Sequence, residues 1–197
     1  MPLLQAILDG LMLGGVYAVI SIGLTLVFGV ISIVNFAQAQ FLMVGMYVAY
    51  FAWHYLGLDP VFGSVLSFIV VFVLGYAVQH VLVRRVLKAP EVAQIFLTVG
   101  LLIVLENLAL ILVGSEFKSV QTWSQNESLE FAGLIVSMPY AIAFLASGVA
   151  GVLVWWLLAK TWWGRTVRAT AQDPMAAKLM GIDPDKIYRL SFGLGVA

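Results

Sequence analysis

Long uncharged runs of hydrophobic residues dominate the pattern of this chain. Residues 11–53 contain no Asp, Glu, Lys or Arg. As one straight helix this run would be roughly 64 Å long, about twice the ~30 Å thickness of the hydrocarbon core of a bilayer. We therefore expect it to cross a membrane twice, with a turn near residues 29–40 that lies within or close to the membrane. Small residues recur in the first span and would allow a neighbouring helix to approach closely, namely Gly10, Gly14, Gly15, Ala18, Gly23 and Gly29.

Three further hydrophobic runs have the length of single spans. They cover residues 61–83, 92–113 and 134–158. A last run, residues 187–197, is too short to cross, so the sequence looks cut inside a span. We expect an all-α integral membrane protein, a polytopic bundle of transmembrane helices with about five complete spans and the start of a sixth. Residues 1–197 would then form part of a single transmembrane domain.

The segment 160–189 breaks this pattern. Asp173-Pro174 is a helix N-cap followed by a proline, Gly181 is a left-handed stop signal, and Asp183-Pro184 repeats the start signal. These signals predict a short, separately capped helix followed by a second helix. A helix this short needs a surface to pack against. Two interpretations remain open, a connector that lies on lipid headgroups and a plug that enters a cleft on a soluble partner.

Composition agrees with a membrane location. Hydrophobic residues make up 62% of the chain and charged residues 10%, with a mean hydropathy of +1.04. The absence of cysteine excludes disulfides and thiol-ligated metals. The sequence contains no nucleotide-binding loop, metal motif or nucleophile motif, so we expect no cofactor, no metal and no catalytic residues. The first residues lack the positive n-region of a signal peptide, and the first span is expected to be retained.

Positive charge is distributed in two clusters that predict the orientation of the chain. Nine of the ten Lys and Arg residues belong to them. The clusters are Arg84, Arg85 and Lys88, and Lys160, Arg165, Arg168, Lys178, Lys186 and Arg189. The positive-inside rule places both in the cytoplasm, and counting spans back places the N-terminus outside. Basic residues beside spans indicate orientation and contact with the lipid bilayer, so we expect no nucleic-acid partner.

Polar side chains at membrane depth are the candidate pathway residues. Asn35, Gln38 and Gln40 lie in the predicted turn, where irregular backbone is tolerated only inside protein or beside water. Glu106 and Asn107 lie inside an apolar run, where a carboxylate is costly unless it is paired, protonated or facing water. We expect these five residues to line a translocation pathway. Alternatively, the amides bond between packed helices and Glu106 lies at the outer interface.

Two motifs carry a resemblance to a known family. Gly164-Arg165-Thr166-Val167-Arg168-Ala169-Thr170-Ala171-Gln172-Asp173 and Ala176-Ala177-Lys178-Leu179-Met180-Gly181-Ile182 resemble the cytoplasmic coupling loop of ABC importer permeases of the branched-chain amino acid type. Asn35-Phe36-Ala37 is similar to the start of the Asn-Phe-Ala-His-Gly-Glu signature of those permeases. Gln38, Ala39 and Gln40 replace its last three residues, so the ionisable pair and the glycine are missing.

The resemblance implies roles and partners. It implies that residues 160–189 form a coupling loop whose short helix docks in a groove of an ATP-binding subunit. The residues to which it assigns coupling are Arg165, Arg168, Ala169, Asp173, Ala176, Ala177, Gly181 and Ile182. Its implied partners are two ATP-binding subunits that hydrolyse ATP, a second permease subunit and an external solute-binding protein, at the bacterial inner membrane. The implied function is import of branched-chain amino acids. The alternatives are a urea or short-amide permease, a secondary transporter or channel without an ATPase, and a membrane scaffold.

Overall fold

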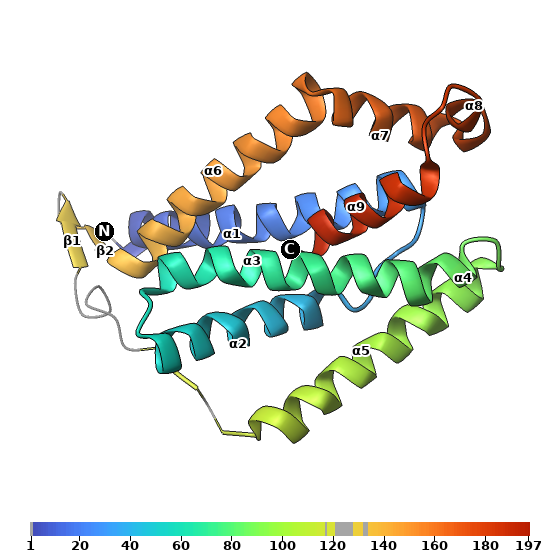
Figure 1. The fold of residues 1–197 in the computed structure, drawn as a ribbon. Coiled ribbons are helices and arrows are strands. Elements are labelled where there is room, and N and C mark those ends of the chain that lie inside the picture. The colour runs from blue at the N-terminus through green and yellow to red at the C-terminus, as the bar shows by residue number, and fades with distance from the viewer. Residues whose placement is uncertain (1, 117, 121–127, 132–133) are drawn as a thin grey trace. The chain divides into compact units, whose positions relative to one another are not determined.

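The computed structural model describes all residues except 1, 117, 121–127 and 132–133, and nearly all of the described chain is helical (Figure 1). Contacts divide the chain into two compact units. Unit 1 comprises residues 1–22 and 121–161, and unit 2 comprises residues 23–120 and 162–197. Each unit is described by itself.

Unit 1 joins the first part of α1 (Pro2–Ile31) to a hairpin and a long helix. The hairpin consists of β1 (Ser128–Phe131) and β2 (Leu134–Ser137), which pair antiparallel, and α6 (Met138–Lys160) follows. The predicted start of this span at residue 134 is therefore wrong, because residues 134–137 form a strand. Gln5 joins α1 to this strand through two hydrogen bonds to Ile135. Its Nε2 donates to the carbonyl of Ile135 at 2.6 Å, and its Oε1 accepts from the backbone N–H of Ile135 at 3.0 Å.

Unit 2 contains the remaining described helices. They are α2 (Gln38–Leu56), α3 (Pro60–Val78), the π-helix η1 (Gln79–Val83), α4 (Arg84–Val86), α5 (Glu91–Val113), α7 (Trp162–Gln172), α8 (Pro174–Leu179) and α9 (Pro184–Val196). α3 lies between α2 and α9, and η1 and α4 continue it (Figure 1). The start of α3 follows its predicted signal, because Asp59 accepts a hydrogen bond from the N–H of Val61 at 2.9 Å. The buried rings of Phe41 and Phe192 join α2 to α9 edge to face, with centroids 6.0 Å apart.

Four helices in the described part of the chain are long and apolar enough to cross a membrane. They cover residues 3–31, 60–86, 91–113 and 138–160. Large apolar side chains on their surfaces are exposed, as with Ile111 and Leu112 of α5, which suits a surface that faces lipid or other subunits. These helices confirm the all-α membrane bundle. α2 is not among the four, since Gln38, Gln40 and His54 make it less apolar, and the predicted span there is not confirmed.

Glycines set the closest helix approach in unit 2. Gly23 of α1 lies against Gly195 of α9, so that a Cβ atom on Gly23 would overlap the Gly195 carbonyl oxygen. A Cβ atom on Gly75 of α3 would overlap the Val196 side chain of α9 and lie 3.1 Å from the Cα atom of Gly193. α9 therefore packs against Gly23 of α1 and Gly75 of α3 at positions where a larger side chain would push it away. Of the other predicted packing glycines, Gly29 has nothing within 4 Å of the position of a Cβ atom.

We expect Gly23→Ala to lower the free energy of unfolding by about 1–3 kcal/mol, because the new methyl group overlaps the α9 backbone. Gly29→Ala is the matched control, since it adds the same methyl group to the same helix in open space. The control is expected to be neutral or to stabilise the helix by up to about 1 kcal/mol. Thermal unfolding of the two variants in detergent makes the comparison, and equal transitions would contradict the packing described here.

Candidate functional site

The N-terminus of α8 is capped as its sequence predicts. Oδ1 of Asp173 accepts hydrogen bonds from the backbone N–H groups of Met175 at 2.8 Å and Ala176 at 3.0 Å. Pro174 occupies the first helical position, where its missing N–H leaves no donor unsatisfied. The chain therefore enters this helix with fixed geometry, although the helix has only six residues.

The C-terminus of α8 is closed by a Schellman motif. Gly181 has a φ of +82°, the left-handed conformation predicted for it. Its N–H donates to the carbonyl of Lys178 at 3.1 Å, and the N–H of Ile182 donates to the carbonyl of Ala177 at 3.0 Å. Both ends of this short helix are thus satisfied by local bonds. The helix is held as a rigid turn rather than as a frayed loop.

α8 presents an apolar surface outward. Met175, Leu179 and Met180 are 77%, 85% and 83% exposed. Ala177 is buried and seats the helix on the rest of unit 2. Three large apolar side chains on a capped turn are unusual for a surface loop, and they form a ready contact for a hydrophobic groove or for lipid.

α7 carries positive charge beside this surface. One face of the helix is buried through Gly164, Val167 and Thr170, at a spacing of three residues. Arg165 and Arg168 directly follow the buried Gly164 and Val167 in the sequence, and both arginines are exposed. The guanidinium of Arg165 lies 4.8 Å from the centre of the Trp162 ring, in a cation–π contact that orients it.

The predicted coupling residues differ in exposure. The exposed ones are Arg165, Arg168, Asp173, Ala176 and Gly181, the half-buried ones are Ala169 and Ile182, and Ala177 is buried. Asp173 and Gly181 are engaged in shaping the ends of α8. These residues thus lie in consecutive elements of unit 2. The exposed ones are available to a partner, and the buried Ala177 packs the helix onto the rest of the unit.

The start of α9 is tied to the end of the long helix that begins with α3. Oδ2 of Asp185 forms an ion pair with Nη2 of Arg84 at 2.7 Å. The guanidinium carbon of Arg189 lies 5.4 Å from the centre of the Tyr76 ring, and Nη1 of Arg189 lies 3.2 Å from Nδ1 of His80. Sequence reasoning missed these contacts, because no local signal joins residues so far apart in the chain.

The polar turn joins α1 to α2 and is bonded inside the protein. Asn35 is 2% exposed, and its Nδ2 donates to Oε1 of Gln38 at 3.2 Å while its Oδ1 accepts from the N–H of Ala37 at 3.1 Å. Nε2 of Gln38 donates to the carbonyl of Gly195 at 2.9 Å. Gln40 is half-buried, and its Oε1 has no hydrogen-bond partner among the described residues. The structure therefore places Asn35 and Gln38 in one network.

The two polar residues of α5 lie elsewhere. Glu106 and Asn107 are exposed on the helix surface, and Nδ2 of Asn107 donates to the carbonyl of Ile103 at 2.7 Å. Neither is hydrogen-bonded to the polar turn within the part of the chain that the structure describes. Thr98 of α5 is buried beside the turn, and its hydroxyl oxygen lies 3.0 Å from the carbonyl oxygen of Ile95 in its own helix and 3.3 Å from that of Val34 in the turn.

Gln79 is a further polar residue that sequence reasoning missed. It begins the π-helix η1 and is fully buried, and neither atom of its amide group has a partner among the described residues. A glutamine inside an apolar run was the available signal. π-Helical turns are frequent at functional sites.

The sequence of this chain is similar to known membrane permeases along nearly its whole length. The family model described as branched-chain amino acid transport system, permease component, matches residues 6–197. The high-affinity branched-chain amino acid transport system permease protein LivH of Salmonella typhimurium is 28% identical over 98% of this chain and 67% of its own length. BraD of Pseudomonas aeruginosa, with the same description, is 29% identical over 98% of this chain and 67% of its own length. No solved structure matches the chain significantly.

We expect Gln38→Leu to destabilise the protein by about 1–3 kcal/mol, because the amide of Asn35 and the buried carbonyl of Gly195 lose a partner. Gln40→Leu is the matched control. It removes an amide whose Oε1 is already unbonded, so a nearly neutral effect is expected. Chemical unfolding of the purified variants measures the difference, and a control as damaging as Gln38→Leu would rule out a special role for the bond to Gly195.

Proposed function

Because this chain belongs to the family of permease components of branched-chain amino acid transport systems, we propose that it forms a membrane-spanning subunit of an ABC importer for branched-chain amino acids. The names of its relatives support this substrate class over urea or short amides. Separate ATP-binding subunits would hydrolyse the ATP. The four long apolar helices supply membrane-crossing elements.

We propose that residues 160–189 form the coupling loop and that α8 is the coupling helix. The observation that carries this proposal is the rigid, doubly capped helix with three exposed apolar side chains. Such a helix fits a hydrophobic groove on an ATP-binding subunit without further ordering, so little conformational entropy is lost on docking. Arg165 and Arg168 on the neighbouring α7 would meet acidic groups at the rim.

The contacts of α9 suggest how a movement of α8 would reach the membrane helices. Only residues 180–183 separate α8 from α9, and the start of α9 is tied to α4 through Asp185 and Arg84. Further along, Gly195 of α9 touches Gly23 and accepts the bond from Gln38. A pull on α8 would therefore move α9 against α1 and α3 and disturb the polar turn.

We propose that this turn belongs to the translocation pathway. Asn35, Gln38 and Gln40 are neutral amides, which suit a zwitterionic amino acid because it needs no counter-charge to cross. Glu106 and Asn107 are exposed on α5, and we propose that they face the pathway in the assembled transporter. The proposed assembly contains two ATP-binding subunits, a second permease subunit and an external solute-binding protein that makes the main selection.

The proposed orientation follows from the basic residues. We place the cluster around Arg84 and the coupling loop in the cytoplasm and the N-terminus outside, in the inner membrane. The ion pair between Arg84 and Asp185 supports a common side for both segments, because it joins the end of the helix that contains α3 to the start of α9.

We expect Gly181→Val to uncouple ATP hydrolysis from transport. Valine is strained at a φ of +82°, so the Schellman motif would open and α8 would lose its fixed geometry. Gly181→Asn is the control, since asparagine tolerates the left-handed region. Uptake per ATP hydrolysed, measured in vesicles with the whole importer, is expected to fall in the valine variant and to persist in the asparagine variant. Normal coupling in the valine variant, at normal expression, would contradict the coupling role of α8.

We expect Gln40→Ala to lower the rate of leucine uptake without changing which solutes compete, because selection lies mainly in the external binding protein. Glu106→Gln is expected to be more damaging if its carboxylate faces the pathway. Competition of labelled leucine uptake by valine, alanine and urea in reconstituted vesicles tests both variants. An altered order of competition would show that the permease itself selects the solute. Uptake of urea without uptake of leucine would show that the proposed substrate class is wrong.

A further inference from the structure

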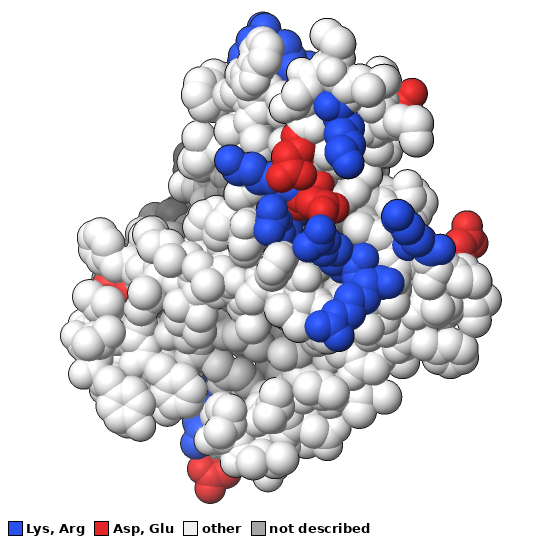
Figure 2. Space-filling model, turned by 45° about the vertical axis from the view of Figure 1, so that its right-hand side comes forward, with Lys and Arg blue, Asp and Glu red and all other residues white. Residues whose placement is uncertain are grey.

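A pocket of about 470 Å³ lies in unit 2 between the end of α4 and the start of α9. The residues that line it are Arg84, Arg85, Leu87, Lys88, Lys178, Asp183, Pro184 and Asp185. In Figure 2, basic side chains surround the acidic ones in a single group. Residues from both basic clusters of the sequence thus share one hollow.

The pocket has unbalanced positive charge. Of its two carboxylates, Asp185 is paired with Arg84 at 2.7 Å, and Asp183 accepts hydrogen bonds from backbone N–H groups at the start of α9. Arg85, Lys88 and Lys178 have no ion pair among the residues that the structure describes. Four basic and two acidic side chains line the hollow, which leaves a surplus of two positive charges, so an anion inside it would lower the electrostatic energy.

The position of the pocket along the helices indicates where that anion comes from. Arg84 and Arg85 belong to the last turn of the hydrophobic helix that covers residues 60–86. Lys88 lies in the short connection to the next candidate span, residues 91–113. The pocket therefore lies beside the ends of two candidate spans, a position that in a bilayer would be close to the lipid headgroups. Basic pockets at this level are suited to acidic phospholipids.

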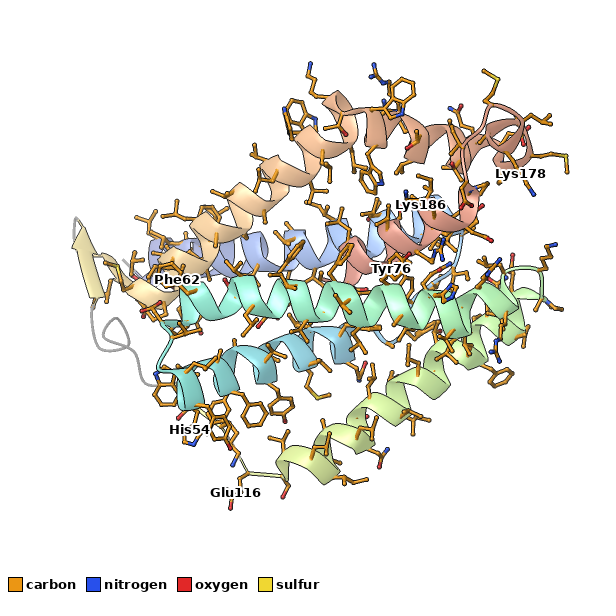
Figure 3. The ribbon with its side chains drawn as sticks, in the orientation of Figure 1. His54, Phe62, Tyr76, Glu116, Lys178 and Lys186 are labelled. Carbon is orange, nitrogen blue, oxygen red and sulfur yellow. The ribbon has the colours of Figure 1, made fainter. Side chains whose placement is uncertain are left out.

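We propose that this pocket binds the headgroup of an anionic phospholipid, with the phosphate held by Arg85, Lys88 and Lys178. Arg85 and Lys88 lie at the end of one span, whereas Lys178 lies on α8 (Figure 3). One phosphate would thus join α8 to the membrane surface through a lipid. Leu87 provides an apolar wall beside it, which a soluble anion does not require. The proposal does not depend on the transported solute.

Native mass spectrometry of the purified full chain tests the proposal, with phosphatidylglycerol and phosphatidylcholine as the probes. The pocket variant is Arg85→Gln/Lys88→Gln, which leaves α8 and the pair of Arg84 and Asp185 intact. The matched control is Lys160→Gln/Lys186→Gln, which removes the same charge from residues that do not line the pocket. We expect phosphatidylglycerol to bind more tightly than phosphatidylcholine. The pocket variant is expected to lose about 30-fold in affinity for phosphatidylglycerol, and the control far less.

Three results would overturn the proposal. An equal loss in the control would show a general effect of surface charge. Displacement of phosphatidylglycerol by inorganic phosphate at a similar concentration would identify a soluble anion as the ligand. Unchanged lipid preference in the pocket variant, together with lost copurification of an ATP-binding subunit, would identify an acidic protein segment as the occupant. If the double variant fails to fold, Lys88→Gln alone is expected to weaken binding about fivefold.

Discussion

The close packing of α9 against α3, together with the contact of Gly23 with Gly195, sets the position of α9 in unit 2. Because neither residue has a side chain, the backbone of α9 lies against α1, close enough for Gln38 to reach the carbonyl of Gly195. The packing of α9 against α3 also brings Asp185 within ion-pair distance of Arg84. The polar turn and the pair of Arg84 and Asp185 thus both meet α9, the turn at its end and the ion pair at its start.

The polar turn shows how neutral groups can be kept inside an apolar bundle. Asn35 is almost completely buried and has partners for its oxygen and its nitrogen. Nε2 of Gln38 donates to the carbonyl of Gly195, and a neutral amide does so at any pH. A histidine at this position would change its charge near neutral pH, which is costly away from water. Glutamine thus supplies a hydrogen-bond donor without a titrating group.

The features that the sequence predicted correctly depend on residues close together in the chain. The cap at Asp173, the left-handed Gly181 and the bounds of α5 follow from local signals and from hydrophobic run length. The features it missed depend on tertiary packing. The pair of Arg84 and Asp185, the buried Gln79 and the strand at residues 134–137 have no periodic signature. The pathway role of Glu106 stays a prediction, because hydrophobic depth does not fix the face of a helix on which a residue lies.

The π-helix η1 places one extra residue in a turn of the helix that α3 begins. Each residue of an α-helix advances the side-chain direction by about 100°, so one residue added to an unbroken α-helix would rotate everything after it. The π-turn takes up one residue locally, because its hydrogen bonds close over one more residue than those of an α-turn. Deletion of a single residue within 79–83, with return to an α-turn, would therefore leave Arg84 oriented toward Asp185 much as before. The same deletion within α3 has no such turn to absorb it and would rotate Arg84 away from Asp185.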